Sequence, residues 1–284
     1  MILSGVCHAT WNLLLKRSGH KTSFLALASI VGGAALLGPA LVAVFVTNLS
    51  ARGIAFGCVT GSIHGVYGLS LARGYRLGDL SSVYPVARGA GLGLVPVAAA
   101  LLLNEEISTV AALGIVMVVA GIYAVHIEGS RLSDLATPLR TLGGNPATRA
   151  ALFTGALIAT YYLWDKHALD EELSPVVLNQ FAMTGHAIIT ASAAFLTSPS
   201  SLSAEWKERR FSIVVAGVLI VVAYLLVLVA LETSQVSYVA PVREVGIVFG
   251  ATVGVLFLGE GAGLWRVWAA ALIVAGVVTL GLAP

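Results

Sequence analysis

The sequence predicts an all-α membrane protein of ten transmembrane helices, arranged as two inverted repeats of five helices each. Three observations support this prediction. Hydrophobic residues make up 58% of the 284 residues and charged residues only 11%, against roughly 25% charged residues in soluble domains. Apolar runs long enough to cross about 30 Å of hydrocarbon recur along the whole chain. Finally, sequence patterns of the first half reappear in the second half.

Hydropathy predicts ten spans, at residues 2–15, 23–46, 53–72, 80–102, 107–126, 150–168, 175–196, 211–231, 236–258 and 264–282. The first segment has no basic residues before its apolar part, so it is interpreted as a span and not as a signal peptide. It is shorter than the roughly twenty residues that a span needs. This shortness leaves open whether the natural chain begins upstream of Met1.

One long polar connection divides the chain. It is rich in Ser, Thr, Pro and Gly, a composition typical of linkers. The predicted organisation is an N-terminal five-helix repeat at residues 1–127, a linker at 128–149 and a C-terminal five-helix repeat at 150–284.

Basic residues are distributed unevenly between the loops. The even-numbered loops hold only Arg52 and Lys166. The odd-numbered loops hold Lys16, Arg17, Lys21, Arg73, Arg76, Arg131, Arg140, Arg149, Lys207, Arg209, Arg210 and Arg266. Because short cytoplasmic loops are enriched in Lys and Arg, we expect the odd loops in the cytoplasm and both termini outside, in a plasma (inner) membrane of bacterial type.

The internal repeat is visible at three places. Residues 79–88 (DLSSVYPVAR) align with residues 235–244 (QVSYVAPVRE), and the turn LNE at 103–105 matches LGE at 258–260. The first span of each half carries Ala-Thr followed by an aromatic residue, with a Lys five residues after the aromatic residue. The two copies are Ala9-Thr10-Trp11 with Lys16 and Ala159-Thr160-Tyr161 with Lys166. Since each half has an odd number of helices, the second copy must enter the membrane from the opposite side, which is an architecture typical of transporters that work by alternating access.

With these residues the chain resembles the drug/metabolite transporter superfamily, and within it the ten-helix EamA family. The resemblance covers essentially the whole chain and rests on the aromatic-then-Lys pattern, the mid-helix Pro85 and Pro241, and the turns at Glu105 and Glu260. The predicted external termini, the aromatic-rich spans and the lack of a carboxylate in the first span look most like the YddG-type amino-acid exporters. The resemblance implies export of small metabolites.

Polar side chains inside spans are the candidates for the site, because a charged residue at a helix centre costs roughly 2.5–3.5 kcal/mol on insertion scales. The predicted substrate-binding residues are His8, Trp11, Asn12, His64, Tyr67, Tyr84, Arg88, Tyr161, Trp164, Asn179, Met183, His186, Tyr224, Tyr238, Arg243 and Glu244. For Trp11 and Asn12, and for the aromatic rings of Tyr161 and Trp164, helix packing is an open alternative. Asp165 is expected to be an interfacial charge near the end of its span.

Two further alternatives concern ionisable residues. The repeat places Arg88 opposite Glu244, which predicts an ion pair that is either structural or leaves Arg88 or Arg243 to receive a substrate carboxylate. His64 and His186 are either hydrogen-bonded structural residues or proton carriers. Spaced glycines at residues 57, 61 and 65 predict a close helix-packing seam.

The leading functional prediction is a secondary transporter that exports amino acids or related metabolites. The alternatives are efflux of lipophilic cations and exchange of nucleotide sugars or phosphate esters, with an intramembrane enzyme as a remote fourth. No HExxH zinc motif, GxGD aspartate motif or ATP-binding loop occurs in the sequence. We expect no catalytic residues, metal or cofactor, no nucleic-acid partner, contact with membrane lipid, and a monomer.

Overall fold

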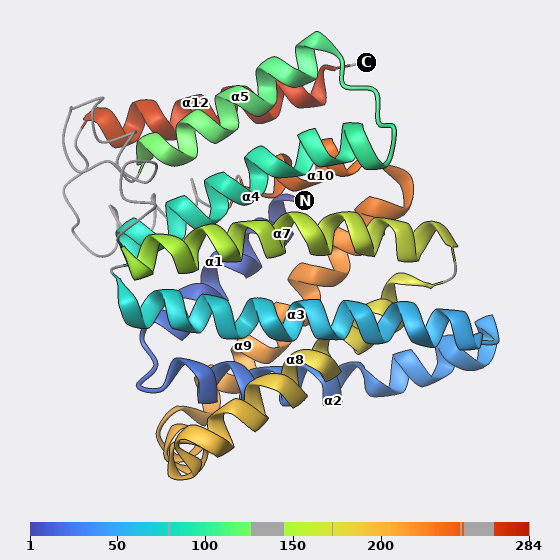
Figure 1. The fold of residues 1–284 in the computed structure, drawn as a ribbon, viewed down its shortest axis with the longest axis vertical. Helices are drawn as coiled ribbons and strands as arrows, with labels where there is room; N and C mark the ends of the chain where they lie inside the picture. The colour runs from blue at the N-terminus through green and yellow to red at the C-terminus, as the bar shows by residue number, and fades with distance from the viewer. Residues whose placement is uncertain (79, 126–144, 172, 245, 247–263, 284) are drawn as a thin grey trace. The chain divides into compact units, whose positions relative to one another are not determined.

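The computed structural model describes residues 1–78, 80–125, 145–171, 173–244, 246 and 264–283. Within these ranges the chain forms ten helices and no strand, which confirms the predicted all-α class (Figure 1). In chain order the helices are α1 (Ile2–Lys16), α2 (Lys21–Thr47), α3 (Ala51–Leu77), α4 (Leu80–Leu102), α5 (Thr109–Val125), α7 (Pro146–Glu171), α8 (Pro175–Thr197), α9 (Pro199–Thr233), α10 (Val236–Arg243) and α12 (Leu264–Gly281).

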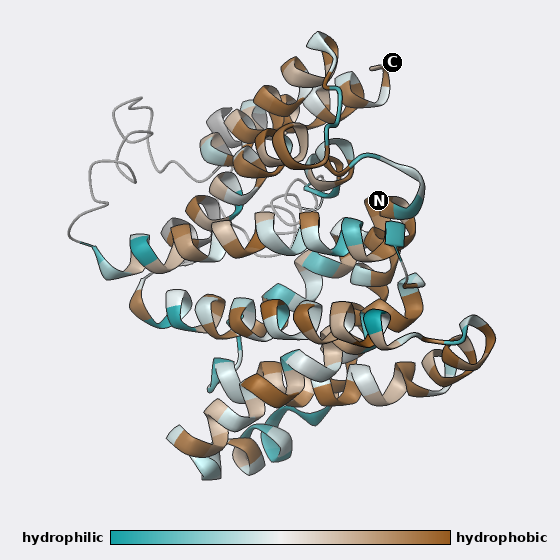
Figure 2. Cartoon of the chain, turned by 45° about the vertical axis from the view of Figure 1, so that its right-hand side comes forward, coloured by the Kyte–Doolittle hydropathy of each residue, from teal (hydrophilic) through white to brown (hydrophobic). Residues whose placement is uncertain are grey.

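The surface of these helices is suited to lipid. Three of them, α2, α3 and α9, are long and apolar enough to cross a membrane by length and composition, and shorter apolar helices cover Val86–Leu102, Thr109–Ala124 and Trp268–Gly281. Large apolar side chains such as Phe45 (81% exposed) and Leu196 (82% exposed) lie on the outside, whereas several His, Arg and Asp side chains are buried. Figure 2 shows hydrophobic residues along most of the helical length.

Most predicted spans coincide with a helix, and the differences have local causes. Helix α7 begins at Pro146, four residues before the predicted start, because Asn145 Oδ1 accepts a hydrogen bond from the Ala147 amide (2.8 Å) and Pro occupies the first helical position. Helix α9 is interrupted by non-helical angles at Arg209 (φ −132°), which separate a polar first part that begins at Pro199 from an apolar part that begins close to the predicted residue 211. The predicted ninth span is helical up to Arg243, and its residues 245 and 247–258 lie outside the described residues, as do linker residues 128–144.

By contacts the chain divides into two compact units. The first comprises residues 1–5, 73–163 and 234–284 and contains α4, α5, α10 and α12. In this unit α5 and α12 run side by side, and Gly114 allows the close approach, because a Cβ there would lie 2.9 Å from the Gly276 carbonyl oxygen (Figure 1).

The second unit comprises residues 6–72 and 164–233. It contains α2, α8 and α9, which pack against one another. The predicted glycine seam lies here: a Cβ on Gly61 would meet the Phe181 carbonyl oxygen of α8 at 2.7 Å, so the two backbones approach closely. Each unit therefore combines helices from both halves of the sequence, and the inverted repeat itself stays a prediction.

A carboxylate from a turn holds the start of α10. Glu105 Oε1 accepts a hydrogen bond from the Val236 amide (2.7 Å) and Oε2 from the Ser237 amide (3.0 Å). The first amides of a helix have no partner within it, and a negative charge there is also favoured by the helix dipole. Glu105 thus fixes the helix that carries Arg243.

Candidate functional site

The first group of buried charged residues lies in the first unit. Arg88 Nη1 of α4 lies 3.2 Å from Glu244 Oε1, directly after α10, and each side chain is only 2% exposed. This contact confirms the predicted ion pair. An unpaired charge in this environment would cost several kcal/mol, so the pair keeps both groups ionised.

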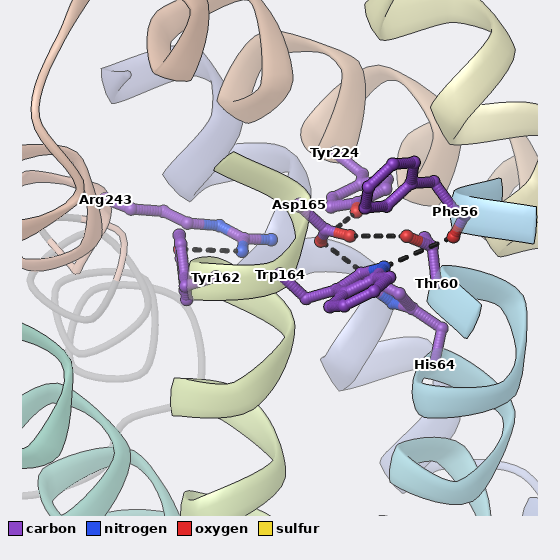
Figure 3. A network of polar contacts seen from close by, with 8 residues as sticks. All are labelled: Phe56, Thr60, His64, Tyr162, Trp164, Asp165, Tyr224 and Arg243. Atoms are coloured by element: carbon purple, nitrogen blue, oxygen red, sulfur yellow. Dashed lines mark hydrogen bonds and ion pairs between the residues drawn. The ribbon is translucent and has the colours of Figure 1, made fainter. Parts of the chain in front are cut away.

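Arg243 provides a second buried guanidinium in the same unit. Its Nη1 donates a hydrogen bond to the Tyr162 hydroxyl oxygen (3.2 Å; Figure 3), and the Tyr162 ring stacks on Tyr161 with centroids 4.8 Å apart. Arg243 also interacts electrostatically with Tyr161 and Arg88. We define Arg88, Arg243, Glu244, Tyr161 and Tyr162 as the arginine cluster.

The arginine cluster contains two guanidinium groups and one carboxylate, so its formal charge is +1. The local backbone explains the position of Arg243: α10 has eight residues, contains Pro241 and ends at Arg243, where a cation is favoured by the helix C-terminus. A positively charged, buried site flanked by tyrosine rings can bind an anionic group such as a carboxylate.

The second group surrounds Asp165 of α7, in the second unit. The prediction of an interfacial charge is wrong, since Asp165 is fully buried. The predicted span ended at residue 168, whereas α7 continues to Glu171. The neighbouring Lys166 bonds to Asp170 Oδ1 (2.8 Å) and to the Leu231 carbonyl oxygen (2.9 Å).

Three side chains contact the Asp165 carboxylate. Thr60 of α3 donates to Oδ1 (2.9 Å), His64 Nε2 of α3 lies 3.2 Å from Oδ2, and the Tyr224 hydroxyl of α9 donates to Oδ2 (Figure 3). Because an ionised carboxylate only accepts hydrogen bonds, we assign the Nε2–H tautomer to His64. These four residues form the aspartate cluster.

His186 of α8 lies next to this cluster. It is 5% exposed, and its Nε2 has no hydrogen-bond partner among the described residues. It interacts electrostatically with His64. The ring occupies the space beside Gly68, where a Cβ would lie 2.0 Å from His186 Nε2.

Trp164 points toward α3. Its indole N–H donates to the Phe56 carbonyl oxygen (3.2 Å; Figure 3), and its ring lies 5.2 Å from the Phe56 ring. Phe56 also contacts the His167 ring, with centroids 5.3 Å apart, and the Arg52 guanidinium, 5.5 Å from its ring. Phe56 is therefore the centre of an aromatic group in the second unit.

The polar face of α1 makes contacts within its own helix. Asn12 Nδ2 donates to the His8 carbonyl oxygen (2.9 Å) and lies 3.1 Å from His8 Nε2, and the His8 and Trp11 rings are 5.0 Å apart, edge to face. Similarly, Asn179 Nδ2 donates to the Val221 carbonyl oxygen (3.0 Å), which ties α8 to α9. The Asn179 bond therefore joins two helices, whereas these Asn12 bonds lie within α1.

The structure thus divides the predicted residues between the two units. The first unit holds Arg88, Tyr161, Tyr238, Arg243 and Glu244, and the second holds His8, Trp11, Asn12, His64, Tyr67, Trp164, Asn179, Met183, His186 and Tyr224. The side chain of Tyr84 lies outside the described residues.

Three contributing residues were missed from the sequence: Thr60, Tyr162 and Asp165. Thr60 lies four residues before His64, and this spacing places both on one face of α3. Tyr162 follows the predicted Tyr161 directly, so only the structure distinguishes their contacts.

An all-helical fold with apolar side chains outside and charged clusters inside defines a polytopic membrane protein. Residues 148–282, just under half of the chain, match the EamA-like transporter family. The match supports the family resemblance in the C-terminal half of the chain, and this family indicates a membrane transporter of small molecules.

Comparison of structures gives the same fold. The chain matches 29 chains of solved structures. One of them is a crystal structure of a protein that matches with a TM-score of 0.75 and 18% sequence identity. The match covers 99% of this chain and 94% of the other. No match to a curated protein was found.

Proposed function

We propose that this protein is a secondary transporter that exports amino acids or related carboxylate-bearing metabolites by alternating access. The observation that carries the proposal is the arginine cluster, which brings two buried guanidinium groups together beside two tyrosine rings. Arg88 pairs with Glu244, whereas Arg243 contacts the Tyr162 hydroxyl. A substrate carboxylate would accept charge-assisted hydrogen bonds from Arg243.

The same cluster suits a zwitterion. An amino acid presents a carboxylate, which fits Arg243, and an ammonium group, which fits the Glu244 carboxylate. The stacked rings of Tyr161 and Tyr162 offer an apolar wall for the side chain of the substrate. We further propose that the odd-numbered loops face the cytoplasm of a cell with this protein in its plasma membrane, and that transport runs outward.

A second candidate function is efflux of lipophilic cations. It is favoured by Asp165, a fully buried carboxylate whose contacts within the described residues include no Lys or Arg. A hydrophobic cation could bind such a carboxylate between aromatic rings. We rank it second because Asp165 already accepts hydrogen bonds from three side chains.

The test is uptake into proteoliposomes containing the purified protein. The panel is labelled threonine, methionine and tryptophan, a quaternary ammonium ion and a nucleotide sugar. Saturable uptake of an amino acid supports the proposal. Uptake of only the quaternary ammonium ion supports the second candidate, and uptake of only the nucleotide sugar contradicts both.

Arg243→Gln tests the role of the arginine cluster. Loss of a charge-assisted hydrogen bond costs roughly 1.5–3 kcal/mol, so we expect the half-saturating amino-acid concentration to rise about tenfold or more. Arg52→Gln is the matched control, because Arg52 is 60% exposed and pairs with Glu171 at the surface. Equal effects of Arg243→Gln and Arg52→Gln would contradict the assignment of Arg243 to substrate binding. Arg243→Lys keeps the positive charge, so it should recover part of the affinity that Arg243→Gln loses.

A further inference from the structure

The aspartate cluster contains a buried acid and a buried base in direct contact. Among the described residues that contact Asp165, only His64 can become positively charged; Thr60 and Tyr224 are neutral donors. The side chains of Asp165 and His64 are 1% and 8% exposed. Their charge therefore cannot be screened by bulk water, and their protonation states depend on each other.

The pair has two states of different charge. With neutral His64 donating through Nε2–H, the pair carries −1, and with protonated His64 it carries zero. Imidazole is the side chain that changes charge near physiological pH, and a neutral total charge is favoured in a buried site. One proton can therefore enter and leave here without any other change in bonding.

We propose that Asp165 and His64 form a proton-binding pair that couples transport to the proton gradient. This inference rests on the proposed transport function and adds its driving ion. Helix α7 carries Asp165 as well as Tyr162, which contacts Arg243. A change of charge at Asp165 that moves α7 would therefore also affect the arginine cluster, which gives proton binding a route to the substrate.

Among the described residues, titratable groups face the pair from α8 and α9. The Tyr224 ring of α9 lies 4.7 Å from the His64 ring, and His186 of α8 interacts electrostatically with His64. A positive charge on His64 therefore disfavours one on His186. On α7, Lys166 follows Asp165 in the chain and is held by Asp170 and the Leu231 carbonyl.

The donors around Asp165 favour a proton over a metal ion. A sodium or potassium ion needs several oxygen ligands with available lone pairs. Here both carboxylate oxygens already accept hydrogen bonds, and His64 presents an N–H. Proton uptake by the pair leaves these contacts in place.

The first test measures proton binding without any substrate. The protein has only six histidines, so the histidine signals of isotope-labelled protein in detergent can be resolved by NMR, and His64→Gln identifies the His64 signal. We expect this signal to change with pH. In Asp165→Asn its midpoint should fall by about 1–3 pH units, because the anion that stabilises the imidazolium is gone.

Asp170→Asn is the matched control, since Asp170 is an exposed carboxylate on the same helix. It should leave the His64 midpoint unchanged. If Asp165→Asn does not fold, Thr60→Val and Tyr224→Phe replace it: removing a donor leaves the carboxylate less stabilised, so the midpoint should rise. A His64 signal that does not titrate, or a midpoint unaffected in the folded variants, would overturn the proposal.

The second test measures coupling in proteoliposomes, using whichever of threonine, methionine and tryptophan exchanges fastest. Wild-type protein should accumulate the amino acid in response to a pH gradient. Asp165→Asn should lose this accumulation while keeping exchange of labelled for unlabelled amino acid. If wild-type protein exchanges the amino acid but does not respond to the pH gradient, the proposed proton coupling is wrong and the proposed transport function still holds. If none of the three amino acids exchanges, the proposed function fails, and the NMR titration still decides whether the pair binds a proton.

Discussion

At the residue scale, one close approach defines the position of His186. An added Cβ at Gly68 would lie 2.0 Å from His186 Nε2 and 2.6 Å from Cδ2, so the imidazole would have to move. Gly68→Ala should therefore lower the free energy of unfolding by about 1–3 kcal/mol, the usual cost of overpacking, measured by thermal unfolding in detergent.

The control for this variant is Gly38→Ala. Gly38 is an exposed glycine inside α2, and among the described residues no atom lies within 4 Å of the added Cβ. This change should cost much less stability than Gly68→Ala, because no side chain in the described part of the chain has to move to admit the methyl group. If Gly68→Ala proved as harmless as Gly38→Ala, the placement of His186 against α3 would be wrong.

Single residues also mark where prediction from sequence ends. The Arg88–Glu244 pair was predictable, because the repeat aligns the two positions and buried charges need partners. Asp165 was not, because it stands beside Lys166 and His167 in a polar stretch that resembles an interface. Only the hydrogen bonds from Thr60 and Tyr224, which come from distant parts of the chain, explain why this carboxylate is buried.

At the scale of the element, hydropathy predicts that a helix exists better than it predicts where the helix ends. The start of α7 is decided by a cap at Asn145 and by Pro146. The start of α9 lies in a polar segment, which a search for apolar runs excludes. The length of an apolar run indicates how much of a helix lies in lipid. Caps and amphipathic segments extend the helix beyond that part.

Helix α10 allows a test of capping across the fold. Glu105→Gln removes the negative charge, and the amide has one acceptor oxygen in place of two, so one of the Val236 and Ser237 amides loses its partner. We expect a loss of about 1 kcal/mol in stability and faster hydrogen exchange at these two amides. Glu106→Gln, at an exposed neighbouring carboxylate, is the control. Equal exchange in both variants would show that Glu105 does not stabilise α10.

At the scale of the whole molecule, the all-helical class followed from composition and recurrent apolar runs, and the match of residues 148–282 to the EamA-like transporter family agrees with the predicted resemblance. The contact units did not follow from the sequence. Periodicity within a helix reports its apolar face, but the choice of neighbour depends on small residues such as Gly61 and Gly114, whose partners are distant in the chain. The two halves were defined by sequence similarity along the chain, whereas each contact unit groups helices that pack together in space.

The orientation of the chain in the membrane can be tested on the two sides of α9. Ser203 lies near the basic residues Lys207, Arg209 and Arg210 in a predicted cytoplasmic loop, and Ser234 lies in a predicted external loop; both are exposed. In a background with Cys7 and Cys58 replaced by alanine, Ser234→Cys should react with an impermeant maleimide on intact cells.

Ser203→Cys should react only after permeabilisation, because basic residues are retained on the cytoplasmic side. The reverse pattern would invert the proposed orientation, while keeping α9 as a span. Reaction of both cysteines on intact cells would mean that α9 does not separate the two sides of the membrane. The predicted orientation assumes that successive loops lie on opposite sides of the membrane, and this assumption would then be wrong at the eighth predicted span.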